Sequence, residues 1–323
     1  MNRLRFLAAV AILLVAAVTV EAQPPRKIPR IGVVTALSAE SPFVAGFFQS
    51  LRELGYTNGR NVIIEWRSSG GNAERFPDLA AELAPLKVDV IVASDNPAIA
   101  AAQKATKTIP IVMVLSADPV GNGFVASLAR PGGNITGLTG QAEVLSKAPQ
   151  LLKEAVPTVK RAAVLWDSTE PGRRRQVSVV EDAARDLGLR LRLLEAHSAA
   201  ELDTAFRTML GERVDALVVM PSQMSFAHRT RIAEFAAKRR LPAIGPARWY
   251  PEAGGLMYYG TSNAERYRRA AYFVDKILKG ANPAELPVEQ PTKFELVINM
   301  KAARALGLII PPSLLLRADR VIE

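Results

Sequence analysis

The alternation of short apolar segments with amphipathic segments constrains this chain more than any other feature of its sequence. Runs rich in Val, Ile and Leu alternate with stretches whose apolar residues recur at helical spacing, which is typical of parallel sheets covered by helices. We expect strands at residues 31–35, 61–66, 88–93, 109–115, 134–138, 161–166, 189–195, 215–219 and 294–298. We expect helices at residues 42–54, 73–84, 97–105, 124–129, 174–187, 199–210, 226–239, 264–278 and 301–306.

The alternation starts again after residue 160, so the sequence predicts two similar units. A chain of 323 residues is long enough for about two domains. The tail after about Gly260 is too short to be a third domain, and we expect it to return and complete both units. The predicted fold class is therefore α/β, with two open, Rossmann-like lobes built on parallel sheets.

A charged and apolar leader predicts export. Arg3 and Arg5 precede an apolar run from Phe6 to Val20, which is shorter than the roughly 20 residues that a membrane-spanning helix needs. Val20-Glu21-Ala22 resembles the small-x-small site of signal peptidase, so residues 1–22 are predicted to be a cleavable signal peptide. The chain has no cysteine, which excludes a lipid-anchored N-terminal cysteine, disulfides and thiolate metal sites. We expect a soluble periplasmic protein.

The basic charge does not point to nucleic acid. The formal net charge is +10, but the basic residues are dispersed, and an exported protein does not meet the genome. The densest cluster, Arg173-Arg174-Arg175, is interpreted as a solvated helix face. A partner at the membrane, or anionic lipid headgroups, would tolerate this charge. We expect no nucleic-acid partner.

No pattern of catalytic residues is present. His197 and His228 are the only histidines and neither has a motif around it, and no G-x-S-x-G elbow occurs. Residues 121–126 match G-x-G-x-x-A, but they follow the fourth expected strand, and Asp118-Pro119 intervenes. That segment is interpreted as a turn. We therefore expect no enzyme activity, no catalytic residue, no cofactor and no metal.

Polar residues gather where strands are expected to end. In open α/β sheets, ligands bind beyond the carboxyl ends of strands, where helix N-termini offer free N–H groups. Hydroxyls and N–H groups suit a ligand carboxylate, and an Asp suits an ammonium. For each residue taken alone, a helix cap or turn former is the favoured explanation. Aromatic residues beside these loops can wall an apolar pocket. The candidate ligand-binding residues are Ser38, Ser41, Ser94, Asp95, Asn96, Ser116, Asp118, Asp167, Ser168, Thr169, Ser222, Trp249 and Tyr250.

Several longer motifs carry a family resemblance. Residues 127–137 read SLARPGGNITG and residues 286–308 read LPVEQPTKFELVINMKAARALGL; shorter matches lie at residues 89–92, 109–112, 118–120 and 253–257. From Ile31 onward the chain resembles the substrate-binding proteins of ABC importers, in the family that includes tryptophan- and tyrosine-type binders. The resemblance implies a type I periplasmic-binding fold, in which two lobes joined by three crossover segments close on a ligand.

The resemblance also implies lobe limits. We expect crossings near residues 138–141, 260–262 and 287–292. The first lobe would then comprise residues 28–139 plus 262–287, and the second lobe residues 141–260 plus 292–323. Two loops depart from the pattern of many relatives: Ser94-Asp95-Asn96-Pro97 replaces a Gly-Thr-Pro loop, and Met220-Pro221-Ser222 replaces an Asp-Pro. Both loops face the expected cleft, so the ligand is left open.

The leading functional hypothesis is a monomeric periplasmic receptor. It would deliver a small carboxylate-bearing molecule, an amino acid or an aromatic acid, to an inner-membrane ABC permease with its ATPase. The alternative is a periplasmic sensor that reports ligand occupancy to a membrane receptor or histidine kinase. Both hypotheses need the same cleft, so the sequence does not separate them.

Overall fold

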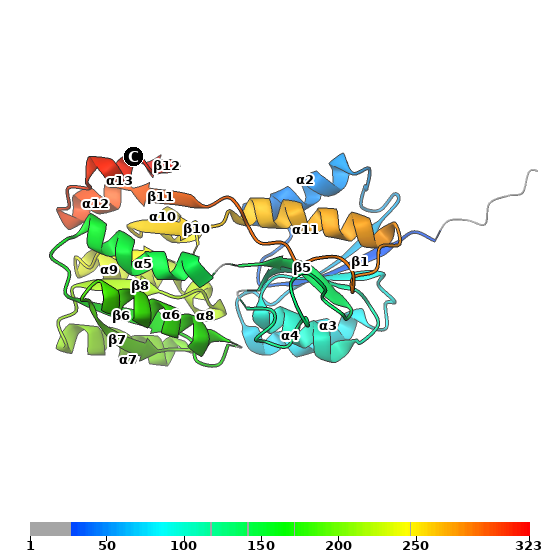
Figure 1. Cartoon of the computed structure of the whole chain (residues 1–323), viewed down its shortest axis with the longest axis horizontal. Helices are drawn as coiled ribbons and strands as arrows, with labels where there is room; N and C mark the ends of the chain where they lie inside the picture. The colour runs from blue at the N-terminus through cyan, green and yellow to red at the C-terminus, as the bar shows by residue number, and fades with distance from the viewer. Residues whose placement is uncertain (1–26, 117, 141, 171, 246) are drawn as a thin grey trace, which may run out of the picture.

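Two α/β lobes lie side by side along the long axis of the molecule (Figure 1). The computed structural model describes residues 27–116, 118–140, 142–170, 172–245 and 247–323. The predicted signal peptide lies outside these residues. Each lobe contains one sheet with helices on both faces, which agrees with the predicted fold class.

The first lobe is built on a five-stranded parallel sheet in the order β2-β1-β3-β4-β5. Side chains alternate between the two faces of a strand. In β1, Ile31 and Val33 accordingly pack beneath α2 and α11, whereas Val34 packs beneath α3 and α4. The elements are β1 (Arg30–Thr35), η1 (Pro42–Val44), α2 (Ala45–Glu53), β2 (Ile63–Ser68), η2 (Ala73–Arg75), α3 (Phe76–Leu83), β3 (Val90–Ala93), α4 (Asn96–Ala105), β4 (Ile111–Ser116), β5 (Ile135–Thr139) and α11 (Asn263–Leu278).

The second lobe is built on a seven-stranded sheet in the order β12-β11-β10-β9-β8-β6-β7. All neighbours are parallel except β10 and β11, which run antiparallel. The elements are α5 (Ala142–Ala155), β6 (Arg161–Trp166), α6 (Arg173–Asp186), β7 (Arg190–Glu195), α7 (Ala199–Gly211), β8 (Ala216–Val219), α8 (Gln223–Ala227), α9 (Arg229–Lys238), β9 (Ala243–Gly245), α10 (Trp249–Glu252), β10 (Met257–Gly260), β11 (Glu295–Asn299), α12 (Met300–Leu306), α13 (Pro312–Leu315) and β12 (Arg320–Ile322).

The chain passes between the lobes in three places. It leaves the first lobe after β5, returns to it after β10 through α11, and enters the second sheet again at β11 (Figure 1). On the last passage, the backbone of Glu289 accepts a hydrogen bond from the Thr139 N–H at 2.9 Å and donates one to the Gly137 carbonyl at 2.9 Å. These two hydrogen bonds join the segment that leaves the first lobe after β5 to the segment that leads into β11. The residue limits of the lobes stay a prediction.

Two expectations about elements need correction. Residues 124–129 form bends and irregular backbone rather than a helix, because the segment is short and the Arg130 N–H donates to the Ser127 hydroxyl rather than to a helical backbone carbonyl. The helix expected at 226–239 starts earlier, at a capping box formed by Ser222 and Ser225, and is interrupted at His228. The sequence did not predict α5, β9, β10, α10, α13 or β12.

Asn299 joins β11 to α12 and carries the first testable prediction. Its Oδ1 accepts the Ala302 N–H at 3.0 Å, and its Nδ2 donates to the Pro251 carbonyl at 2.8 Å in a buried position. Asn299→Ala should cost about 1–3 kcal/mol in urea unfolding, because it removes a helix cap and leaves a buried carbonyl unpaired. The control is Asn282→Ala, which removes an exposed turn hydrogen bond to Ala284. Equal losses in the two variants would contradict the prediction.

Candidate ligand-binding site

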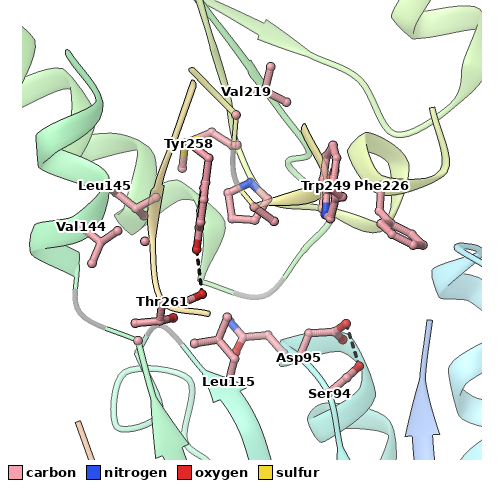
Figure 2. Close-up of a pocket in the computed structure, with 18 of the residues that line it drawn as sticks. Ser94, Asp95, Leu115, Val144, Leu145, Val219, Phe226, Trp249, Tyr258 and Thr261 are labelled. Atoms are coloured by element: carbon pink, nitrogen blue, oxygen red, sulfur yellow. Dashed lines mark hydrogen bonds between the residues drawn. The ribbon is translucent and has the colours of Figure 1, made fainter. Parts of the chain in front are cut away.

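A cavity of about 240 Å³ lies between the lobes, at the carboxyl ends of β3 and β8. Cavities for drug-sized ligands measure roughly 300–1,000 Å³, so this one suits a smaller molecule. Figure 2 shows Val144 and Leu145 on one side of it, and Trp249 and Phe226 on the other. The rings of Trp249 and Phe226 meet edge to face at 5.8 Å. The walls are therefore largely apolar and aromatic.

Asp95 is placed in the cavity by its role at the start of α4. It follows β3 directly, and its Oδ1 caps the helix by accepting the Ala98 N–H at 3.2 Å. Its Oδ2 accepts from the Ser94 hydroxyl at 2.9 Å and from Nε2 of Gln223, a residue of the other lobe, at 2.6 Å. The carboxylate thus contacts both lobes.

A buried ion pair from the second lobe lies in the same cavity. The Arg173 guanidinium bonds the carboxylate of Glu170 and the side chain of Gln176, and all three residues are buried. The other carboxylate oxygen of Glu170 accepts the backbone N–H of Gln223 at 3.0 Å. The pair is held in a fixed geometry, because each of its ends is hydrogen bonded to a further group.

Burial controls the electrostatics of the cavity. Burial, followed by the nearby charge of Glu170, raises the pKa of Asp95 to about 6. Burial also lowers the pKa of Arg266, which lines the cavity from α11. The Tyr267 hydroxyl is hydrogen bonded to Thr35 Oγ1 at 2.9 Å, and burial raises its pKa above the ordinary value. Both charge signs are therefore present, and each charge is costly in this apolar setting.

The structure brings part of the predicted set together. Gln223 lies beside the predicted Ser222, and the Tyr258 hydroxyl donates to the Thr261 carbonyl at 2.7 Å where the chain leaves β10. Of the candidates from the sequence, those that line the cavity are Ser94, Asp95, Asn96, Ser222 and Trp249.

The remaining candidates lie outside the cavity lining, each with a structural role or in solvent. Ser38, Ser168 and Thr169 are exposed, although Thr169 donates to the buried Asp167 from its N–H and its hydroxyl. Ser41 accepts the Phe43 N–H at the start of η1. The remaining three are Ser116, buried at the end of β4; Asp118, bonded to the Gly121 N–H and to Arg175; and Tyr250, whose buried ring lies between Gly245 and Gly255.

Sequence reasoning missed the buried ion pair and the residues from the hinge. Arg173 was interpreted as part of a solvated face; that is wrong for this residue, which is buried, and right for Arg174 and Arg175, which are mostly exposed. The burial of Arg173 could have been predicted from the helical periodicity, because Arg173 and Gln176 share a face with the core residues Val177 and Val180. Thr261 and Arg266 gave no local signal, since only the return of the chain brings them to the cavity.

Arg175 links the lobes outside the cavity and carries the second prediction. Its guanidinium bonds Asp118 at 2.8 Å and Asn122 at 3.0 Å across the cleft. The pair is largely exposed, so Arg175→Ala should change the free energy of closure by about 1 kcal/mol or less, equal to a ligand affinity change of up to about fivefold. Calorimetric titration checks this. A larger loss that persists at high salt would contradict it, because exposed pairs are screened.

Two α/β lobes with a cavity between them define a two-lobe solute-binding protein of the periplasmic-binding fold. The sequence agrees, since the profile of the ABC transporter substrate binding proteins matches residues 30–322. The chain belongs to this family. The family is defined by substrate binding rather than by catalysis, and such proteins typically work outside the cytoplasm.

Individual proteins are also similar to this chain over most of its length. A tyrosine-binding protein of Clostridioides difficile is 26% identical over 263 residues, which cover 81% of this chain and 76% of the relative. An ABC domain from Streptococcus pneumoniae, solved in complex with L-Trp, is 28% identical with a TM-score of 0.84, and the match covers 91% of this chain and 99% of that one. A conserved domain protein from Vibrio cholerae has a TM-score of 0.85 at 28% identity, with 91% and 100% covered.

The described residues offer neither a membrane-spanning helix nor a metal-binding cluster. None of the helices between residues 27 and 323, apart from the four gaps given above, combines the length and apolar character needed to cross a membrane. The same residues contain no cluster of three or more His, Asp or Glu that could hold a metal ion.

Proposed function

We propose that this protein is a periplasmic receptor for a small carboxylate-bearing molecule, an amino acid or an aromatic acid, which it delivers to an inner-membrane ABC permease. The observation that carries the proposal is the cavity itself, which combines aromatic walls with buried charges of both signs. The names of two relatives, one a tyrosine-binding protein and one solved with L-Trp, support the same ligand class.

The apolar walls would receive the side chain of the ligand. Val144 and Leu145 face Trp249 and Phe226 across the space (Figure 2). Burying an apolar side chain there gains roughly 25 cal/mol for each Å² removed from water. An aromatic ring has the additional benefit of edge-to-face contact with Trp249.

The carboxylate of the ligand would be neutralised by Arg266. This residue is a cation in an apolar environment, and burial lowers its pKa because the charged form has lost its hydration. A carboxylate brought into contact with the guanidinium offsets that cost through charge-assisted hydrogen bonds. The interaction also links α11 of the first lobe to the ligand.

Closure would convert binding into a signal for the membrane partner. A ligand that contacts both lobes binds the closed form more tightly than the open form and so shifts the population toward it. The permease would recognise the closed form. We propose that a monomer suffices, because the cavity is lined by one chain. The sensor hypothesis stays open, and genes for a permease and an ATPase beside this one would favour transport.

A thermal-shift panel on the unfolded and refolded mature protein tests the proposal. The panel contains aromatic and branched amino acids, aromatic acids, nucleosides and sugars. A ligand at about 100 times its Kd should add roughly 2.7 kcal/mol to the native state, or several degrees in Tm. A response confined to sugars or nucleosides would overturn the proposed ligand class.

A variant that fills the cavity gives the matching prediction. Leu145→Trp should abolish the shift produced by the best ligand while the protein stays folded, because Leu145 faces the cavity (Figure 2). The control is Lys147→Trp, which lies on the same helix and is exposed. Unchanged ligand affinity in Leu145→Trp would show that the ligand binds elsewhere.

A further inference from the structure

We propose that Asp95 and Gln223 form a site for a cationic amine across the cleft, beside Glu170, so that the lobes close stably on a ligand only when it carries an ammonium group. The inference rests on the proposed receptor function and narrows it: the ligand is an amino acid, and aromatic acids without an amine are excluded. It also gives a role to Glu170 and Gln223, which the position of the cavity alone does not explain.

The two carboxylates come from opposite lobes, and both accept hydrogen bonds from Gln223. Asp95 begins α4 in the first lobe, and Glu170 precedes α6 in the second. Gln223 donates its side-chain amide to Asp95 at 2.6 Å and its backbone N–H to Glu170 at 3.0 Å. Each carboxylate lies close enough to influence the other, since the charge of Glu170 disfavours ionisation of Asp95. Bringing the lobes together therefore brings two like charges together.

The two carboxylates differ in how their charge is compensated. Glu170 has Arg173 as a buried ion-pair partner. Asp95 has neutral donors only: the Ser94 hydroxyl, the Ala98 N–H and the Gln223 amide. Among the described residues, no Lys, Arg or His lies within ion-pairing distance of Asp95. Of the two carboxylates, Asp95 is thus the one without a direct ion-pair partner among the described residues, although the nearby charge of Arg173 lowers its pKa.

A second acceptor lies beside this charge. Gln223 is buried, its Nε2 is committed to Asp95, and its Oε1 has no hydrogen-bond partner within the described part of the chain. An unmet buried acceptor costs about 1–3 kcal/mol. An ammonium group has three N–H donors and a positive charge. It would satisfy the amide oxygen and neutralise Asp95 at once, which a hydroxyl or a carboxylate does not do.

Charged and titratable groups of both signs face Asp95: the charge of Glu170 raises its pKa and the charge of Arg173 lowers it. Glu170 and Arg173 face it from the second lobe, and Tyr267 faces it from α11. Arg266 lies on the same helix beside Tyr267 and is assigned to the carboxylate end of the ligand. Burial and Glu170 together raise the pKa of Asp95 to about 6, so the carboxylate is ionised at neutral pH and is in need of a cation.

Matched ligand pairs test the requirement for an amine. We would compare L-tryptophan with indole-3-propionate, and L-tyrosine with 3-(4-hydroxyphenyl)propionate, by calorimetric titration of the refolded mature protein. The amino acids should bind about 10- to 100-fold more tightly than the compounds without the amine, in line with a charged hydrogen bond. Asp95→Asn should remove most of this difference. Asp215→Asn is the control, because its carboxylate caps backbone N–H groups of Lys160 and Arg161 far from the cavity.

The pH dependence of binding gives the second readout. An acid whose pKa is raised is protonated below that pKa, and the protonated form does not attract an ammonium. With a pKa of about 6, the affinity for an amino acid should be about tenfold weaker at pH 5 than at pH 7. The same change of pH should have little effect in Asp95→Asn. Equal pH dependence in both proteins would overturn the role of Asp95.

The ligand-free protein provides a test that does not depend on the choice of ligand. Ionised Asp95 opposes the folded, closed state, so the Tm of Asp95→Asn relative to the wild type should rise between pH 5 and pH 7.5. A structural helix cap that favours the ionised carboxylate at the N-terminus of α4 is ionised in both the folded and the unfolded state over this range, so it gives no slope.

The outcomes separate this inference from the proposed function. Equal binding of the members of each ligand pair would overturn the amine site and leave the receptor function standing. Binding by none of the four compounds would overturn the aromatic ligand class, and the absence of a Tm slope would then overturn the buried charge of Asp95 on which the amine site depends.

Discussion

Gly137→Ala should destabilise the first lobe by about 4 kcal/mol or more and sharply lower the yield of folded protein. Gly137 lies in β5 with a φ of +127°, a conformation that side-chain-bearing residues rarely adopt. A Cβ there would lie 2.4 Å from the carbonyl oxygen and 2.6 Å from the amide nitrogen of Met113. These are backbone atoms of the neighbouring strand β4, so the sheet itself would have to move.

The effect should extend to the passage between the lobes. The Gly137 carbonyl accepts the N–H of Glu289, so moving β5 also disturbs the returning segment. The matched control is Gly133→Ala, four residues earlier, where a Cβ would meet nothing within 4 Å. Urea unfolding should place the control within about 0.5 kcal/mol of the wild type. A stable Gly137→Ala protein would show that β4 and β5 can separate at this point.

Arg173→Ala should cost about 3–5 kcal/mol of stability, the largest effect expected from a charged residue in this chain. The guanidinium is buried and bonds Glu170 and Gln176. Its removal leaves the carboxylate of Glu170 without its cation, in an apolar cavity that also contains Asp95. An unpaired buried charge is far more costly than a missing buried pair.

The next residue in the sequence is the matched control for this prediction. The Arg174 side chain is 63% exposed and that of Arg173 is 6% exposed, and Arg174 pairs with the half-buried Glu181. Arg174→Ala should therefore change the free energy of unfolding by about 1 kcal/mol or less. Similar losses in the two variants would mean that burial does not distinguish these arginines.

Local sequence pattern predicted most of the first lobe. Its strands are short apolar runs bounded by turn residues, and its helices carry standard stop and start signals, such as Gly55 at the end of α2 and Asp95 at the start of α4. The second lobe was predicted less completely. Strands β9 and β12 have three residues each, which is too short for a periodic signal, and the antiparallel position of β11 depends on a return from the other lobe.

The residues of the candidate site also divide into those that local sequence predicted and those that depend on the tertiary structure. Ser94, Asp95 and Ser222 follow strands directly, so their place at the sheet edge could be inferred from position alone. Asp118 and Asp167 satisfy the same rule, yet their carboxylates are used outside the cavity: that of Asp118 by the Gly121 N–H and Arg175, and that of Asp167 by Thr169. Position after a strand selects candidates, and the local hydrogen bonds decide which of them face the ligand.

The sequence by itself determined the two α/β lobes, the family resemblance and the loops that border the cleft, because these follow from periodicity and from motifs within short stretches of chain. Only the tertiary structure decided that Gln223 meets Asp95 from the other lobe, that Arg173 turns inward while Arg174 turns outward, and that Arg266 reaches the cavity. The physical reason is that these contacts join residues far apart in the chain, and the energy of a buried charge depends on which distant groups surround it.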